Sequence, residues 1–226
     1  MLSDMQNTIG IGSASQLVRN KVLRNTYWLL ALTMVPTVLG AFIGVQMHFQ
    51  VSGILGLIAV LAMVYGFPYI IEKNSDSGLG VALLLAFTFF MGLIMAPLLT
   101  RTLGYANGGM MIMTAFGGTA SILAVMAGWA TVTKRDFSTM GKWLGIAMMV
   151  MILAAIANIF LGMGALSILI SVAVIAISSA FILYEVQQVV NGGETNYIRA
   201  AMNLYFSLFN IFTSILSLLG LGGSRD

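Results

Sequence analysis

The chain has 226 residues, of which 59% are hydrophobic and only 8% are charged. Soluble domains carry about 25% charged residues, so this composition excludes a soluble globular enzyme and indicates a membrane protein. Cysteine is absent, and the single histidine, His48, falls in a short polar connection. We therefore expect no metal site, no cofactor and no catalytic residues. The formal charge of +3 is not gathered into a run of Lys and Arg, so we expect no nucleic-acid partner.

Apolar segments long enough to cross a bilayer follow one another along the chain. A hydrocarbon core of about 30 Å needs about 20 apolar residues in a helix. The first four segments of this kind are residues 26–45, 53–71, 79–99 and 109–132. Short polar or charged stretches separate them, so each segment is predicted to be one transmembrane helix.

The second half of the chain contains one unusually long uncharged stretch. Residues 143–184 lack any charge, which is about twice the length of a single span, and a Gly-Met-Gly sequence at 162–164 lies near its middle. We predict two helices joined by a tight turn, followed by a last span at residues 200–221. The fold class is therefore an all-α, polytopic bundle of seven transmembrane helices over residues 26–221. Flexible tails are predicted at residues 1–25 and 222–226.

The charges on the connections indicate an orientation. When the connections are assigned alternately to the two sides of the membrane, only Arg101 and Arg225 fall on one side. All other basic residues fall on the opposite side: Arg19, Lys21, Arg24, Lys73, Lys134, Arg135, Lys142 and Arg199. By the positive-inside rule the amino terminus is predicted to be cytoplasmic and the carboxy terminus to lie outside the cytoplasm.

The last span carries polar residues at helical spacing: Asn203, Ser207, Asn210, Ser214 and Ser217. Amides and hydroxyls in hydrocarbon need partners, so this stripe is expected to face the interior of the bundle. The last helix is therefore predicted to be central. Two interpretations of the stripe stay open: hydrogen bonds between helices, or the lining of a hydrated pathway.

Glu185, near the end of the sixth span, is the candidate proton-sensing residue. Folding the chain back at Gly192 and Gly193 brings Asn203 to the level of Glu185, puts Ser207 one turn deeper and leaves Arg199 nearer the surface. A carboxylate buried among amides is a candidate proton sensor, because desolvation disfavours its charged form. The alternative is a glutamate at the membrane interface that snorkels to the surface or pairs with Arg199 or Lys73.

Two further patterns are expected to serve packing. Asn158 in the fifth span is predicted to form hydrogen bonds between helices, and the spacing of Gly40 and Gly44 predicts a close approach of two helices.

Three stretches of the sequence resemble the Bax inhibitor-1 family, and in particular its bacterial YccA-like branch: residues 21–27 (KVLRNTY), 157–160 (ANIF) and 192–200 (GGETNYIRA). The resemblance extends from about residue 21 to the end of the chain. It implies a bacterial inner-membrane protein in which six helices surround a seventh.

The resemblance implies two different functions. YccA-like proteins are substrates and modulators of the membrane AAA protease FtsH and associate with its partners HflK and HflC. Other bacterial members are pH-sensitive calcium leak channels, with acidic residues on the sixth and seventh helices and a basic residue on the second. Glu185 matches the sixth-helix acid, but Ser207 stands at the position of the seventh-helix acid, and residues 53–71 contain no basic residue. These departures favour protease modulation over a calcium leak.

A protease that extracts membrane helices must first engage an unstructured segment. Residues Met1 to Gln16 contain one charge, Asp4, and several small polar residues such as Ser3, and such a composition cannot bury enough apolar surface to fold alone. We expect this segment to be the point of protease engagement; the alternative is an ordinary disordered terminus.

Overall fold

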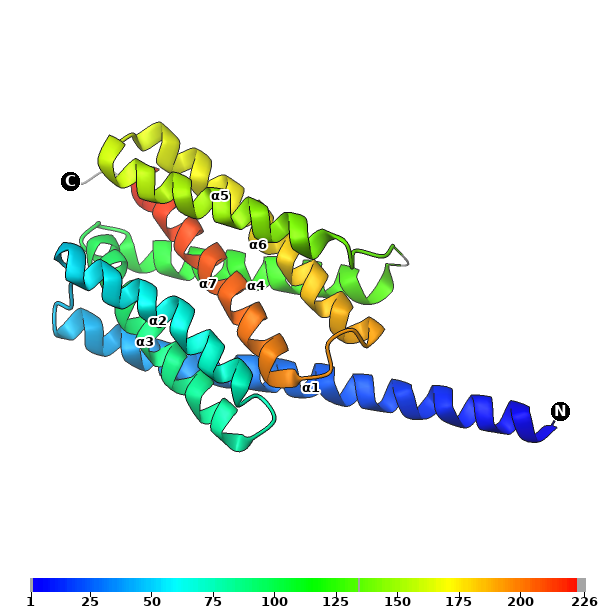
Figure 1. Cartoon of the computed structure of the whole chain (residues 1–226). Coiled ribbons are helices and arrows are strands. Elements are labelled where there is room, and N and C mark those ends of the chain that lie inside the picture. The colour runs from blue at the N-terminus through cyan, green and yellow to red at the C-terminus, as the bar shows by residue number, and fades with distance from the viewer. Residues whose placement is uncertain (1, 134, 223–226) are drawn as a thin grey trace.

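The computed structural model describes residues 2–133 and 135–222, with side chains from Gln16 onward except that of Leu57. This part of the chain is all-α (Figure 1). Its helices are α1 (Leu2–Gln46), α2 (Gly53–Lys73), α3 (Gly78–Leu103), α4 (Gly108–Val132), α5 (Met140–Leu161), α6 (Gly164–Asn191) and α7 (Tyr197–Gly222). All seven are long and apolar enough to cross a membrane, with the span in α1 beginning at Gln16. The predicted seven-helix membrane bundle is confirmed.

The turn that divides the long uncharged stretch lies where the sequence predicted it. α5 ends at Leu161, and Gly162 has a positive φ of 62°, which glycine adopts at little steric cost. Asn158 holds the turn, because its Nδ2 donates to Ser167 Oγ at 2.7 Å and its Oδ1 accepts the amide of Met163 at 3.1 Å. The predicted role of Asn158 as a link between two helices is confirmed.

The boundary predicted for the amino-terminal tail, residues 1–25, stays a prediction. α1 begins at Leu2, and its residues near position 19 already contact the bundle: the Arg19 guanidinium donates to the Val190 carbonyl at 3.3 Å. A helix that is anchored in the membrane extends without a new nucleation step, so polar residues that tolerate helix can prolong it. Figure 1 shows the amino-terminal part of α1 projecting beyond the other helices. Met1 lies outside the described residues.

Hydrogen bonds between distant segments define the two ends of the bundle. At one end, Arg19 near the start of the membrane span of α1 contacts the end of α6, Asn196 before α7 contacts the α2–α3 connection, and Gln187 of α6 contacts the α4–α5 connection. We call this the α1-start end. At the other end, Tyr105 in the α3–α4 connection donates to the Gly220 carbonyl of α7 at 2.9 Å. We call it the α7-tail end.

Glycines allow α1 and α3 to lie close together. A Cβ added at Gly40 of α1 would collide with the Phe89 carbonyl of α3, and one added at Gly92 of α3 would collide with the Thr37 carbonyl of α1. A Cβ at Gly44 would lie 2.6 Å from the Ala96 Cβ. The close approach predicted for Gly40 and Gly44 is therefore confirmed.

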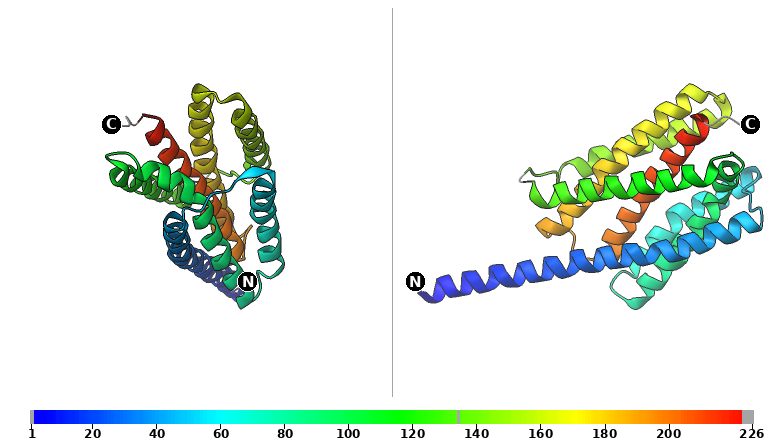
Figure 2. Two further views of the ribbon diagram at one scale, coloured as in Figure 1. Left: turned by 90° about the vertical axis from the view of Figure 1, so that its left-hand side faces the viewer. Right: turned by 180° about the vertical axis from the view of Figure 1, so that it is seen from behind.

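α7 is in contact with α1, α2, α3, α4 and α6, whereas α5 packs only against α6 within the described part of the chain. Figure 2 shows α7 crossing obliquely between neighbouring helices. Its largest fully buried side chain is that of Tyr205. The Tyr205 hydroxyl lies 3.0 Å from Thr37 Oγ1 of α1 and donates to the Thr88 carbonyl of α3 at 3.5 Å. One tyrosine thus joins three helices in the core.

Candidate functional site

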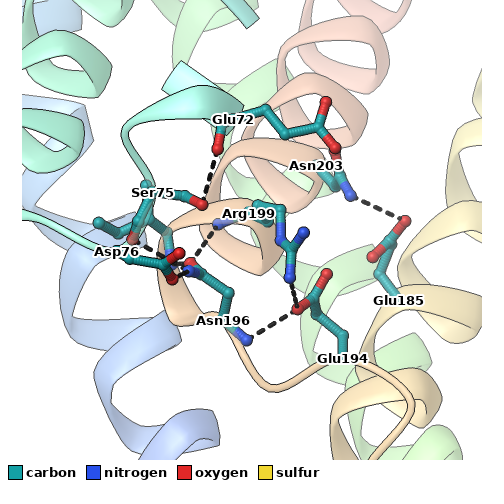
Figure 3. Close-up of polar contacts among 9 residues, drawn as sticks. Glu72, Ser75, Asp76, Glu185, Glu194, Asn196, Arg199 and Asn203 are labelled. Atoms are coloured by element: carbon teal, nitrogen blue, oxygen red, sulfur yellow. Dashed lines mark hydrogen bonds and ion pairs between the residues drawn. The ribbon is translucent and has the colours of Figure 1, made fainter. Parts of the chain in front are cut away.

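Glu185 of α6 and Asn203 of α7 meet near the α1-start end of the bundle (Figure 3). Asn203 Nδ2 donates to Glu185 Oε1 at 3.2 Å, and the glutamate is only 8% exposed. The level of Asn203 that the sequence predicted is confirmed. Since Asn203 is neutral, this hydrogen bond does not neutralise the charge of the carboxylate.

The connection between α6 and α7 creates this juxtaposition. Gly192 has a φ of 80°, which ends α6, and the Gln188 carbonyl accepts the amides of Gly193 at 2.8 Å and Glu194 at 3.0 Å. These bonds satisfy carbonyls at the helix end and reverse the chain within a few residues. α7 therefore returns antiparallel to α6, with Asn203 opposite Glu185.

Arg199 pairs with a different carboxylate from the one the sequence suggested. Its Nη2 lies 3.2 Å from Glu194 Oε1 in the α6–α7 connection. Lys73, the other proposed partner, lies 4.5 Å from the centre of the Tyr69 ring. Within the described part of the chain Glu185 has no ion-pair partner. The alternative in which Glu185 pairs with Arg199 or Lys73 is wrong, because Glu194 lies closer along the chain to Arg199.

The deeper members of the polar stripe do not reach Glu185. Ser207 is buried, and its hydroxyl donates to the Asn203 carbonyl of its own helix at 3.2 Å. Asn210 is half-buried, and its backbone carbonyl accepts a bond from Thr213 at 3.2 Å. Of the stripe residues, Asn203 alone makes a side-chain bond to another helix in the described part of the chain. Of the stripe residues only Ser207 and Ser214 are buried, and the stripe contributes one bond between helices in the described part of the chain.

The residues expected to engage a protease lie in the amino-terminal part of the chain. Met1 is outside the described residues, Ser3 and Asp4 fall in the first turns of α1, and Gln16 is exposed. Lys134 and Arg225, which entered the charge comparison, are also outside the described residues.

Asn196 is a residue that the sequence analysis missed. Its Oδ1 accepts the amides of Ile198 at 2.9 Å and Arg199 at 3.2 Å, so it caps α7. Its Nδ2 donates to the Ser75 carbonyl and to Asp76 Oδ1, both at 2.9 Å, in the α2–α3 connection (Figure 3). An asparagine directly before a helix is a recognisable cap, but its bonds across the bundle leave no local signal.

Gln187 is a second such residue. It is 4% exposed, its Oε1 accepts the Phe137 amide at 2.8 Å and its Nε2 donates to the Arg135 carbonyl. The α4–α5 connection is therefore fixed to α6 two residues beyond Glu185. The signal available in the sequence was an amide, Gln187, that follows the carboxylate of Glu185 by two residues near the end of an apolar helix.

The chemistry of the site follows from these contacts. Within residues 2–133 and 135–222, no three His, Asp or Glu side chains are grouped to hold a metal ion. Glu185 can gain or lose a proton, and either change alters its hydrogen bond with Asn203. Because these two residues join α6 to α7, protonation would act directly on the packing of this helix pair.

Comparison with known proteins adds a family match over nearly the whole chain. The family model described as inhibitor of apoptosis-promoting Bax1 matches residues 19–225.

Relatives of similar length align from end to end. The modulator of FtsH protease YccA of Escherichia coli K12 is 40% identical over 212 residues, which cover 94% of each chain. An uncharacterized protein of Neisseria meningitidis serogroup A is 36% identical over 220 residues, which cover 95% of this chain and 97% of the relative. An uncharacterized protein of Pseudomonas aeruginosa is 33% identical over 225 residues, which cover both chains fully.

Proposed function

The chain belongs to the Bax inhibitor-1 family, and on that premise we propose that it modulates a membrane protease of the FtsH type. The observation that carries the proposal is the 40% identity, over 94% of both chains, with a relative named as a modulator of FtsH protease. HflK and HflC, the partners of that protease, belong to the same proposal. The protein would act in the bacterial inner membrane, because a relative in another Escherichia coli strain is named an inner membrane protein.

The proposed orientation places the α1-start end in the cytoplasm. This end carries Arg19, Lys21, Arg24, Lys73, Arg135, Lys142 and Arg199, while Arg101 lies in the last turn of α3, toward the α7-tail end. The positive-inside rule supports this assignment. We also propose α7 as the central helix, supported by its contacts with five other helices. A reporter fused to the amino terminus should then be cytoplasmic and one fused to the carboxy terminus periplasmic.

The protein is proposed to be a substrate of the protease as well as its modulator. The supporting feature is α1, whose amino-terminal part extends past the other helices on the proposed cytoplasmic side (Figure 1). A segment that protrudes from the bundle is the part of a membrane protein that an ATP-driven protease can pull first.

Copurification and pulse-chase decay test the two parts separately. The tagged protein should copurify with the protease, and extra copies should lengthen the lifetime of a second protease client. Deleting residues 2–16 should slow the decay of the protein itself, while deleting residues 223–226, on the proposed periplasmic side, should not. No copurification and no effect on the client would refute modulation. Unchanged decay after the amino-terminal deletion, in cells where the protease degrades the full-length protein, would refute engagement through this segment.

A pH-sensitive cation leak is the second candidate function. It is favoured by the buried position of Glu185 and its bond to Asn203 at the α6–α7 contact. It is disfavoured by Ser207, where leak channels of the family carry a second acid, and Ser207 is bonded to its own helix.

Calcium flux into liposomes tests this candidate. Glu185→Gln should remove the pH dependence of any leak, and Ser207→Asp should widen it, because two close carboxylates titrate in two steps. Identical pH profiles for wild type and both variants would exclude Glu185 as the sensor.

A further inference from the structure

A recess of about 590 Å³ opens where α1 meets the start of α7 and the first turns of α3. Its lining comprises Arg24, Asn25, Trp28, Leu29, Leu32, Val81 and Tyr197. Figure 1 shows the first turns of α7 beside α1. The recess is separate from the contact of Glu185 with Asn203, whose residues do not line it.

Three hydrogen-bond donors line the recess and have no partner within the described part of the chain. The Arg24 guanidinium, the Asn25 amide and the Tyr197 hydroxyl make no side-chain hydrogen bond or ion pair in the described part of the chain. No carboxylate lines the recess, and Lys21 lies one helical turn outward on α1. The recess therefore presents an uncompensated positive charge next to neutral donors.

Polarity changes in one direction along the wall that α1 contributes. Arg24, Trp28 and Leu32 follow one another at intervals of four residues, so they span about 12 Å along the helix axis. Trp28 is 73% exposed and Leu32 is 48% exposed. The order is cation, interfacial aromatic residue, then aliphatic residue, which is the order of phosphate, glycerol region and acyl chain in a phospholipid leaflet.

We propose that this recess binds an anionic glycerophospholipid. Arg24 pairs with the phosphate, Asn25 and Tyr197 donate to the phosphate or glycerol oxygens, and Leu29, Leu32 and Val81 contact the upper part of an acyl chain. A zwitterionic lipid brings its own cation to the same place and gains less from Arg24. The site therefore selects lipids by net headgroup charge.

Quenching of Trp28 by brominated lipids measures this selection at the site. The chain has three tryptophans, so replacing Trp129 and Trp143 with Phe leaves Trp28 as the only indole. Vesicles of phosphatidylcholine receive either brominated phosphatidylglycerol or brominated phosphatidylcholine at the same mole fraction. We expect phosphatidylglycerol to associate about fivefold more strongly, since a basic side chain near anionic lipid contributes about 1 kcal/mol.

Arg24→Gln should abolish the preference, and Arg24→Lys should keep part of it, because Lys keeps the charge and loses the two-pronged geometry. Lys142→Gln is the matched control: it removes one exposed positive charge from the same end of the bundle but away from the recess. Its preference should stay at the level of the parent protein. Arg24 is exposed and makes no side-chain bond to the described part of the chain, so the variant should fold; an unchanged helical circular dichroism spectrum in vesicles checks this.

Three results would overturn the proposal. Equal quenching by the two brominated lipids would show that the recess does not select headgroups. Equal losses in Arg24→Gln and Lys142→Gln would assign the preference to the general surface charge. Release of quenching by inorganic phosphate, at an ionic strength matched with sodium chloride, would assign the recess to a soluble anion.

Discussion

The two ends of the bundle are held together in different ways. At the α1-start end, side chains bond across elements that are far apart in the sequence, as Asn196 does with Ser75 and Gln187 does with Phe137. At the α7-tail end, Asn158 bonds only within the α5–α6 turn, and Tyr105 contacts Gly220. The first end is a cross-linked layer of connections, whereas the second combines a local turn with a bond between distant segments, from Tyr105 to Gly220. The candidate carboxylate, Glu185, lies under the cross-linked layer.

This difference shows that a sequence motif typical of the family can serve to position helices rather than to form the site itself. The stretch GGETNYIRA contributes the Gly192 turn, the Asn196 cap and the ion pair of Arg199 with Glu194. All three features fix the position of α7 against α6 and α3. These features align Asn203 with Glu185. In the described part of the chain, no residue of the motif itself forms a hydrogen bond with the Glu185 carboxylate.

The largest expected effect comes from removing Asn196. Asn196→Ala deletes a helix cap and two bonds to the α2–α3 connection, so it should lower the free energy of unfolding by about 3 kcal/mol. Asn158→Ala, the same substitution at the other end, removes bonds within one turn and should cost about 1 kcal/mol. Unfolding in micelles titrated with a denaturing detergent measures both. Equal losses would break the contrast between the two ends.

A smaller effect is expected at Gln187. Gln187→Ala removes two bonds from a side chain that is 4% exposed and should cost about 2 kcal/mol. Hydrogen–deuterium exchange should accelerate at Phe137, whose amide loses its acceptor. Gln187→Glu keeps that acceptor and is the matched control, so protection of the Phe137 amide should survive in it. Unchanged exchange in the alanine variant would show that the α4–α5 connection is held by other contacts.

Replacing the glycine that ends α5 or the one that ends α6 should lower the stability of the protein by the same amount, although the two glycines lie at opposite ends of the bundle. Gly162 has a φ of 62° and Gly192 a φ of 80°, and a side chain strains the backbone in this region by about 1 kcal/mol. A Cβ at either position meets no atom closer than 3.6 Å. Gly162→Ala and Gly192→Ala should therefore cost the same within error in detergent unfolding. A much larger loss at Gly192 would mean that the turn also depends on the cross-linked layer.

Sequence reasoning reached those features that depend on local patterns. The seven apolar segments, the turn at Gly162 and the level of Asn203 opposite Glu185 follow from segment length, glycine and helix geometry. A hairpin of two antiparallel helices leaves little freedom in which residues face each other, so the α6–α7 contact could be predicted from the position of its turn.

The contacts that sequence reasoning did not reach depend on how separate hairpins pack. Asn196 and Ser75 are 121 residues apart, and Gln187 and Phe137 are 50 apart. No periodicity within one helix encodes such a pair. The pairing of Arg199 with Glu194 was likewise out of reach, because it depends on the tight turn that brings Glu194 back over the first turn of α7.

The smallest expected effect is at Asp136, in the connection that Gln187 holds at the α1-start end. The Ser138 amide donates to Asp136 Oδ1 at 2.8 Å, and this bond, followed by one from the Ser138 hydroxyl, lowers the pKa of Asp136 from its ordinary value of 3.8. A carboxylate whose pKa is lower in the folded state stabilises the fold above its unfolded pKa and loses that contribution as the pH falls through the folded value. The bond from the Ser138 amide to Asp136 should therefore be intact from neutral pH down to about pH 4, and acidification over that range should leave it in place.

Carbon-13 NMR of the Asp136 carboxyl should give a midpoint below 3.8. Ser138→Pro removes the amide donor and should return the midpoint toward the ordinary value, while Ser138→Ala keeps the amide and should move it less. A midpoint in Ser138→Pro equal to that of the wild type would show that Ser138 does not hold the carboxylate. The α4–α5 connection would then be fixed by the bonds of Gln187 and not by Asp136.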